Sequence, residues 1–124
     1  MEKKKVLVVD DEENIRLLVH NILGKESIVL EAKDGEAAVQ MARSHNPDLI
    51  LMDIMMPNMD GYTACYVIKK DPVTEAIPVV MLTALGQELN VKLGQEMGAD
   101  GYITKPFSAE MLLDTVNSFL TESK

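Results

Sequence analysis

Short apolar runs alternate with segments of helical periodicity along the whole chain, and this alternation constrains the fold more than any other feature. The runs predict strands at Lys5–Asp10, Ser27–Ala32, Leu49–Asp53, Pro78–Leu82 and Gly101–Lys105. They are rich in Val, Ile and Leu, and they are mostly continuous rather than alternating. A continuous apolar run is typical of a strand that is buried on both faces, as in a parallel sheet.

The segments between the runs predict amphipathic helices, because their apolar residues recur at helical spacing. Gly24, Pro47 and Gly98 are suitable stop signals, and Ser108 is a suitable N-cap for the last helix. The apolar stripes are Ile15, Leu18, Val19 and Ile22; Ala37, Ala38, Met41 and Ala42; Ala64, Cys65 and Ile68; Leu89, Leu93 and Met97; and Leu112, Val116, Phe119 and Leu120. Five strand–helix units predict a single α/β domain over residues 1–124, a doubly wound (βα)5 sandwich with a five-stranded parallel sheet.

The charge balance and the short leading segment exclude several classes of protein. With 12 Lys and Arg against 20 Asp and Glu, the net charge is −8, whereas a protein that binds nucleic acid directly needs a basic surface. The single cysteine, Cys65, excludes an internal disulfide and a Cys-rich zinc site. After Lys3–Lys5 the apolar run is too short for a signal peptide or a membrane span. We therefore expect a cytoplasmic protein without direct contact to nucleic acid or to a membrane.

Polar and charged residues stand at the carboxyl ends of four predicted strands: Asp10 with Asp11, Asp53, Thr83 and Lys105. In a doubly wound fold these ends border the crevice where ligands bind. Three carboxylates gathered there repel one another by roughly 3 kcal/mol per pair, at about 5 Å and an effective dielectric constant near 20. Because Lys105 offers only one positive charge, a hard divalent cation, Mg²⁺ or Mn²⁺, is the expected complement.

A pocket with a metal, an ammonium group, a hydroxyl and a carboxylate is suited to phosphoryl transfer, which depends on positioning and on neutralising the phosphoryl oxygens. The carboxylate is then either a metal ligand or the nucleophile itself. The chain has no GxxxxGK[ST] segment or other Gly-rich phosphate loop. We therefore do not expect bound ATP to be the phosphoryl donor.

Four segments carry a resemblance to a known family. They are Val-Leu-Val-Val-Asp10-Asp11-Glu-Glu, Leu-Met-Asp53-Ile-Met-Met-Pro57-Asn-Met-Asp60-Gly61, Met-Leu-Thr83-Ala84 and Gly-Ala-Asp-Gly-Tyr102-Ile-Thr-Lys105-Pro106-Phe107. With these segments in order, the chain resembles the response regulator receiver domain of two-component systems over essentially its whole length. The resemblance implies the flavodoxin-like strand order 2-1-3-4-5.

The resemblance also implies a role for each matching residue. Asp53 is the expected phosphoacceptor, Lys105 pairs with the phosphoryl group, and Thr83 donates a hydrogen bond to one of its oxygens. Asp11 binds Mg²⁺ directly and Asp10 largely through water. Asp53 and the backbone carbonyl of Met55 are the further metal ligands, and Thr83 and Tyr102 form the switch pair. Pro106 is the cis-proline. The residues that flank the phosphoryl group are Ile54, Ala84 and Leu85.

A signalling switch, rather than an enzyme with a separate substrate, is what the resemblance implies. A sensor histidine kinase or a phosphotransfer protein supplies the phosphoryl group from a phosphohistidine, and the domain catalyses only its own phosphorylation and dephosphorylation. The kinase is expected to dock at Ile15, Leu18 and Phe107, and the readout surface is the fourth helix, the fifth strand and the fifth helix. The output is an unknown partner protein, or an output domain missing from this chain.

Two apolar residues predict a long-lived phosphoryl group. In the family, the positions of Met55 and Leu85 flank the path of the water that attacks the phosphoryl group. Neither residue can orient this water as Asn, Gln or Glu would. We therefore expect slow self-dephosphorylation.

Two other classes of protein are alternatives. One is a small Mg²⁺-dependent phosphohydrolase that works through an aspartyl-phosphate. Against it, Asp53-Ile54-Met55 lacks the second Asp that haloacid-dehalogenase-type hydrolases place two residues after the nucleophile. The other is a flavodoxin-like flavin carrier, but no Ser/Thr-rich phosphate loop follows the first strand, and Asp10-Asp11 would repel the cofactor phosphate.

Overall fold

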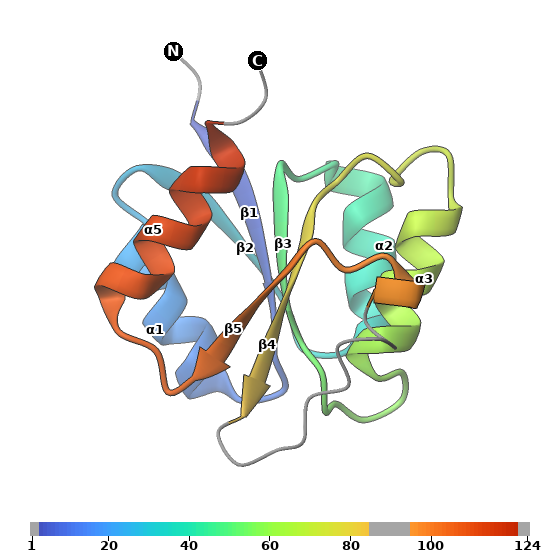
Figure 1. Cartoon of the computed structure of the whole chain (residues 1–124), viewed down its shortest axis with the longest axis horizontal. Helices are drawn as coiled ribbons and strands as arrows, with labels where there is room; N and C mark the ends of the chain where they lie inside the picture. Colours follow the sequence, from blue (N-terminus) through green and yellow to red (C-terminus); the bar gives the residue numbers. More distant parts are fainter. Residues whose placement is uncertain (1–2, 85–94, 122–124) are drawn as a thin grey trace.

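A computed structural model describes residues 3–84 and 95–121 of this chain. The elements, in chain order, are β1 (Lys4–Val9), α1 (Glu13–Leu23), β2 (Ser27–Ala32), α2 (Gly35–His45), β3 (Leu49–Asp53), α3 (Gly61–Lys70), β4 (Val79–Ala84), β5 (Gly101–Lys105) and α5 (Ala109–Leu120). The strands form one parallel sheet in the order β2-β1-β3-β4-β5. Helices α1 and α5 lie on one side of it, and α2 and α3 lie on the other (Figure 1). The predicted fold class and strand order are confirmed.

Two apolar layers fill the space between the sheet and the helices. Neighbouring residues of a strand point to opposite faces, so Leu7 and Ile50 pack with the α2 and α3 side, whereas Val6 and Leu51 pack with the α1 and α5 side. Every residue of β3 is buried. This burial on both faces is the reason why the strands appear in the sequence as continuous apolar runs.

Two strands differ from the prediction in their boundaries. β1 begins and ends one residue earlier than predicted, at Lys4 and Val9, so Asp10 is the first residue of the following loop. β4 begins one residue after Pro78, which has no amide hydrogen, and continues to Ala84 because Thr83 and Ala84 still pair with β5. Thr83 therefore lies inside a buried strand and not beyond its end.

Side-chain caps fix where three of the helices begin. Asp34, Asp60 and Ser108 each accept a hydrogen bond from the backbone amide three residues further on, at the starts of α2, α3 and α5. This bond satisfies one of the amides that the first turn of a helix leaves unpaired. The predicted cap at Ser108 is confirmed.

The apolar stripe predicted for α1 is partly wrong. Leu18 is 40% exposed, and the fully buried residues of this helix are Val19 and Leu23. Burial follows the line of the helix that faces the sheet, and Leu18 lies to one side of that line.

The helix predicted through Leu89, Leu93 and Met97 cannot be compared in full, because Leu89 and Leu93 lie outside the described residues. Among the helices that the structure describes, none is long and apolar enough to cross a membrane.

Candidate functional site

Three carboxylates meet at the carboxyl ends of β1 and β3. Asp10 and Asp11 directly follow β1, and Asp53 is the last residue of β3. One carboxylate oxygen from each residue lies within 4.8 Å of those from the other two. Asp10 and Asp53 are buried, whereas Asp11 is exposed. The three meet because β1 and β3 are parallel neighbours in the sheet and end at the same edge.

Lys105 reaches this acid cluster, Asp10, Asp11 and Asp53, from the end of β5. Its Nζ lies 3.0 Å from Asp10 Oδ2 and 3.3 Å from Asp53 Oδ1, and its side chain is only 14% exposed. Burial by itself lowers the pKa of an ammonium group, but the hydrogen bond and charge of Asp10, joined by those of Asp53, raise the pKa of Lys105 above its ordinary value. The ammonium therefore stays charged and links two carboxylates that repel each other.

Burial raises the pKa of both buried carboxyl groups. Desolvation, with the charge of Asp10 in addition, raises the pKa of Asp53 to about 6 against the opposing effect of Lys105. Desolvation also raises the pKa of Asp10, against hydrogen bonds from the Glu12 amide and from Lys105. The Lys105 ammonium thus compensates only part of the negative charge in the site, and a further cation would be bound favourably.

Thr83 brings a buried hydroxyl to the same edge of the sheet. It follows Leu82, the residue of β4 that pairs with Asp53 of β3. Thr83 is 3% exposed, and its Oγ1 has no hydrogen-bond partner among the residues that the structure describes. Leaving such a group unpaired costs about 1–3 kcal/mol. An unpaired donor at the edge of the sheet that also carries the Lys105 ammonium fits an anion with several oxygens, such as a phosphoryl group.

Gly61, the first residue of α3, holds the backbone that follows Asp53. Its amide donates to the carbonyl oxygen of Ile54 at 2.8 Å. A Cβ at this position would lie 2.2 Å from the carbonyl oxygen of Asp53 and 2.9 Å from the Cα of Ile54. Any side chain at residue 61 would therefore displace the backbone of Asp53.

The other predicted residues of the site differ in exposure. Ile54 is buried, the side chain of Met55 is 65% exposed, and Ala84 is exposed. Tyr102 in β5 is partly buried, and desolvation raises the pKa of its hydroxyl. Leu85 lies outside the described residues.

The predicted docking residues lie on the α1 and α5 side of the sheet. Ile15 and Phe107 are partly buried and pack against the same apolar cluster, and Leu18 is exposed. The peptide bond between Lys105 and Pro106, just before Phe107, is cis.

Two residues near the acid cluster were not predicted from the sequence. Glu12 Oε1 lies 4.0 Å from Lys105 Nζ, and its position directly after the aspartate pair is a signal that could have indicated it. Arg16 donates a hydrogen bond from Nη1 to the carbonyl oxygen of Asp10 at 2.7 Å. No local pattern marks Arg16, because a single cation in an amphipathic helix is common in any sequence.

The donor set fits a divalent cation, since carboxylate oxygens are the ligands that Mg²⁺ and Mn²⁺ prefer. We predict that Mg²⁺ at a hundred times its dissociation constant stabilises the fold by about 2.7 kcal/mol. A thermal melt would show this as a rise of several degrees, which EDTA reverses. Asp11→Asn, which alters the exposed member of the cluster, should lose most of the rise. An equal melting temperature with and without Mg²⁺ would contradict the metal site.

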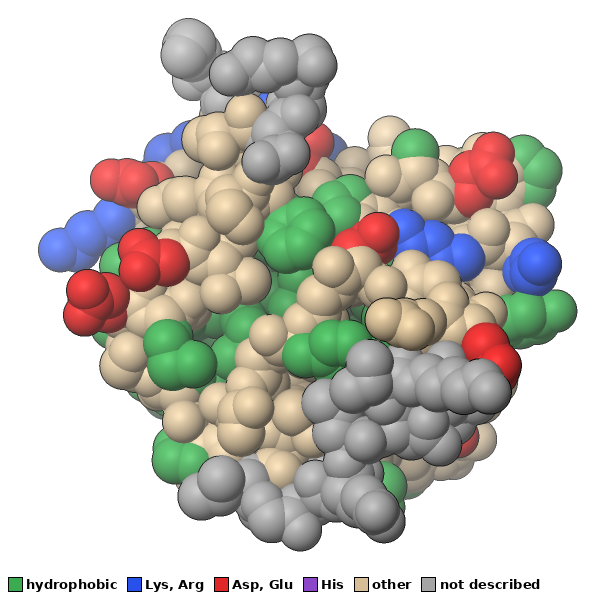
Figure 2. Space-filling model, viewed as in Figure 1, with side chains coloured by type: hydrophobic (Ala, Val, Ile, Leu, Met, Phe, Trp, Pro, Cys, Tyr) green, Lys and Arg blue, Asp and Glu red, His purple; other side chains and the backbone are tan. Residues whose placement is uncertain are grey.

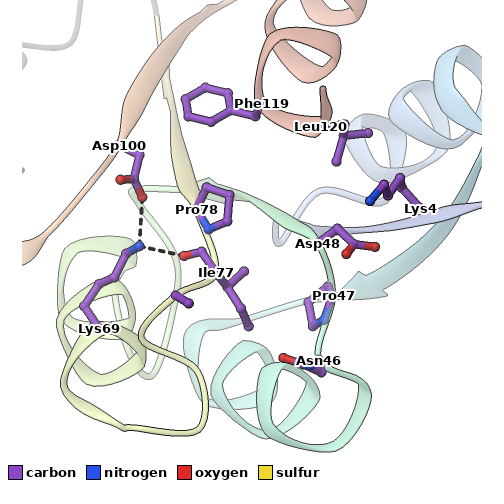
Figure 3. A pocket seen from close by; sticks show the side chains of 11 residues that line it. Lys4, Asn46, Pro47, Asp48, Lys69, Ile77, Pro78, Asp100, Phe119 and Leu120 are labelled. Atoms are coloured by element: carbon purple, nitrogen blue, oxygen red, sulfur yellow. Dashed lines mark hydrogen bonds and ion pairs between the residues drawn. The ribbon is translucent and has the colours of Figure 1, made fainter. Parts of the chain in front are cut away.

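A cavity of about 490 Å³ lies at the opposite edge of the sheet, where the strands begin (Figure 3). Lys69 points toward it, but its Nζ lies 2.6 Å from the carbonyl oxygen of Ile77 and 2.8 Å from Asp100 Oδ2. This ammonium is therefore already neutralised within the chain. The acid cluster, by contrast, retains uncompensated charge, and we take it as the functional site.

The family model described as the response regulator receiver domain matches residues 6–117 of this chain. The match covers most of the chain. It favours the switch over the two alternatives raised from the sequence, the phosphohydrolase and the flavin carrier.

Curated relatives agree with this match. The chain is 42% identical over 122 residues to the alkaline phosphatase synthesis transcriptional regulatory protein PhoP of Bacillus subtilis, covering 98% of this chain and 50% of the relative. It is 45% identical over 115 residues to the response regulator PleD of Caulobacter vibrioides, covering 92% of this chain and 25% of the relative. The chain thus spans about half the length, or less, of these relatives.

Solved structures show the same fold. The chemotaxis response regulator CheY4 of Vibrio cholerae has a TM-score of 0.89 and 32% identity, covering 96% of this chain and 100% of that one. The signal receiver domain of a signal transduction histidine kinase from Syntrophus aciditrophicus has a TM-score of 0.89 and 34% identity, covering 98% of this chain and 92% of that one.

Proposed function

The chain belongs to the response regulator receiver domain family of two-component systems, and on this basis we propose that it is a phosphorylation switch with Asp53 as the phosphoacceptor. Receiver domains are signalling switches, and one observation supports this acceptor above all. Asp53 is a buried carboxylate with an ammonium group 3.3 Å away, beside a strand that carries a buried, unpaired hydroxyl.

In the proposed reaction, a carboxylate oxygen of Asp53 attacks the phosphorus atom of a phosphohistidine. The O–P bond forms as the N–P bond breaks, and the electron pair of the broken bond returns to the imidazole ring of the donor. Phosphoryl transfer of this kind depends on position and charge compensation more than on covalent help from the protein. The Lys105 ammonium and the Thr83 hydroxyl would contact the phosphoryl oxygens from two sides.

The acid cluster would hold the metal that this reaction needs. The proposed ligands are Asp10, Asp11, Asp53 and the backbone carbonyl of Met55, with Mg²⁺ as the expected ion and Mn²⁺ as the alternative. When bound, the ion supplies positive charge to the phosphoryl oxygens. The buried Asp10 also holds the ammonium of Lys105 through its contact at 3.0 Å, next to the acceptor.

The test of this function is the intact mass of the protein after incubation with acetyl phosphate and Mg²⁺. We expect a gain of one phosphoryl group, and no gain when EDTA removes the metal. A small phosphodonor separates the chemistry of this chain from the recognition of a kinase. The proposal fails if no phosphoryl group is gained and beryllofluoride, a mimic of the phosphoryl group, does not bind either.

The proposed output is a change on the face that contains β5 and α5. The phosphoryl group would draw the Thr83 hydroxyl toward Asp53, and the ring of Tyr102 on the neighbouring strand would turn inward. Thr83 and Tyr102 lie on adjacent strands, with Tyr102 paired to Met81 of β4. Figure 2 shows hydrophobic side chains in the hollow between α5 and β5. A partner could read a change in this apolar surface.

The proposed phosphodonor is a sensor histidine kinase or a phosphotransfer protein that docks at Ile15, Leu18 and Phe107. The exposed Leu18 gives this surface an apolar contact. The relative PhoP is a transcriptional regulator of about twice the matched length. For this chain, we propose that the output is either a separate partner protein or a further domain of a longer polypeptide.

Met55→Asn is expected to shorten the lifetime of the phosphoryl group roughly tenfold, because an amide can orient the attacking water. This change in rate is modest compared with that of full general acid–base catalysis. Met55 is 65% exposed, so the change should leave the fold intact. The measurement is the rate at which the phosphoryl adduct disappears after acetyl phosphate is removed. Met55→Leu is the matched control, and equal half-lives for the two variants would show that residue 55 does not control the water.

A further inference from the structure

We propose that the corner between β2 and α2, residues 31–35, positions both of the loops that would hold the metal. This inference rests on the proposed function, because it concerns the metal site beside the phosphoacceptor. The carboxyl end of β2 contributes no residue to the acid cluster. Two side chains of this β2–α2 corner, Glu31 and Asp34, instead hold the two loops from outside.

The first contact holds the loop of Asp10 and Asp11. Arg16 donates from Nη1 to the carbonyl oxygen of Asp10 at 2.7 Å, and from Nε to Glu31 Oε1 at 3.0 Å. The side chain of Arg16 is only 16% exposed. The carbonyl of Asp10 belongs to the peptide group that joins Asp10 to Asp11. The guanidinium group, anchored by Glu31, therefore fixes the orientation of this peptide group and also adds a positive charge beside the cluster.

The second contact holds the loop of Met55. Asn58 lies three residues further on, and its φ of 70° is in the left-handed region that Asn tolerates. Its Nδ2 donates to Asp34 Oδ2 at 3.1 Å, while Asp34 Oδ1 accepts from the amide of Ala37 at 2.8 Å. One carboxylate thus caps α2 and holds the loop at the same time. These two hydrogen bonds lower the pKa of Asp34, and the bond from the Ala37 amide has the larger effect. The carboxylate therefore stays ionised.

A backbone contact joins the same loop to the same corner. A Cβ at Gly35 would lie 2.4 Å from the carbonyl oxygen of Met59. The loop therefore rests directly on the first turn of α2, and a side chain at residue 35 would lift it.

The acid cluster needs such support because its members repel one another. Lys105 joins the carboxylates of Asp10 and Asp53, but it contacts neither the peptide group between Asp10 and Asp11 nor the loop of Met55 among the contacts of the described residues. Further positioning of the two loops therefore has to come from groups outside the cluster. Loops that are already in place also lose less conformational freedom when the ion binds, which strengthens binding. Groups that orient metal ligands in this way typically change metal affinity by about 10–100-fold when they are replaced.

The test compares Arg16→Gln and Asn58→Gly with the wild type and with Gln40→Ala, a substitution at an exposed position of α2. Glycine tolerates the positive φ at residue 58 and removes the side-chain hydrogen bond to Asp34. The two readouts are the dissociation constant of Mg²⁺ alone, by calorimetry well below the melting temperature, and the melting temperature in EDTA. We expect about tenfold weaker Mg²⁺ binding in both variants, and wild-type binding in Gln40→Ala.

A purely structural role predicts a different pattern. If Arg16→Gln and Asn58→Gly melt earlier in EDTA but bind Mg²⁺ as the wild type does, the β2–α2 corner does not position the loops. If Arg16→Gln does not fold, Glu31→Gln replaces it, since it neutralises the anchor and leaves Arg16 in place. An unchanged dissociation constant for Glu31→Gln would also overturn the inference. Wild-type protein that bound no Mg²⁺ would instead overturn the proposed metal-dependent function, and this inference with it.

Discussion

Asp53→Asn is expected to take up no phosphoryl group from acetyl phosphate and, at pH 7, to be more stable than the wild type. The first effect follows from the loss of the carboxylate oxygen that would attack the phosphorus atom, because an amide oxygen is a poor nucleophile. Intact mass spectrometry with Mg²⁺ present measures it. A phosphoryl adduct on the variant would place the acceptor at another residue.

The gain in stability follows from the cost of ionising Asp53 in the folded protein. Asp53 is 6% exposed, and desolvation raises its pKa from 3.8 to about 6. Between these two values the folded state binds more protons than the unfolded state, so stability falls as the pH rises from about 4 to above 6. A shift of this size corresponds to roughly 3 kcal/mol at pH 7. The pKa of about 6 already includes the opposing effect of Lys105, so asparagine, which avoids the cost of ionisation, should give a net gain of about 3 kcal/mol.

Urea unfolding in EDTA, at pH 7 and at pH 4.5, measures the gain. The difference between Asp53→Asn and the wild type should be large at pH 7 and shrink toward pH 4, where the wild-type carboxyl is protonated. Asp114→Asn, at an exposed position of α5, is the control for general effects of charge. A difference that does not depend on pH would show that the buried charge is not its cause.

Lys105→Met is expected to destabilise the fold by about 3–5 kcal/mol at pH 7, the usual cost of removing one partner from a buried ion pair. Methionine has a similar length but no charge, so Asp10 and Asp53 are left buried without the ammonium that joins them. The variant should also take up the phosphoryl group more slowly. Urea unfolding in EDTA measures the loss of stability, and Lys33→Met, at an exposed position, is the control.

Restoring the charge balance should recover most of this loss. The double variant Lys105→Met with Asp53→Asn has one buried carboxylate fewer and should be more stable than Lys105→Met alone. Without Lys105 the pKa values of Asp10 and Asp53 rise further, so acid should also stabilise the single variant. If the double variant is no more stable than the single one, the cost comes from packing and not from charge.

The fold was predictable because burial on both faces leaves a direct mark in the sequence. Every residue of β3 is buried, and the strand appears as the apolar run Leu49–Asp53 with the same bounds. The boundary of β4 was less predictable, since Thr83 and Ala84 extend the strand only through their pairing with β5. The exposure of Leu18 was also decided by packing, because a periodic stripe does not reveal which of its residues face the sheet.

The meeting of Asp10, Asp53 and Lys105 was predictable for a similar reason. In a parallel sheet, all strands end at one edge, so residues at the ends of neighbouring strands lie close together whatever their separation along the chain. The structure brings the carboxylates of Asp10 and Asp53 within hydrogen-bond distance of the Lys105 ammonium nitrogen. The same rule did not indicate Glu31 or Asp34, because neither side chain belongs to the acid cluster.

The sequence by itself determined the strands, their burial, and the set of charged groups at the carboxyl edge, because each depends on residue type and local spacing. Only the tertiary structure decided how the site is supported. The contact of Arg16 with Glu31 and that of Asn58 with Asp34 join residues 15 and 24 positions apart. Such contacts depend on how helices and loops pack across the edge of the sheet, and packing distances of this kind leave no periodic pattern in a single sequence.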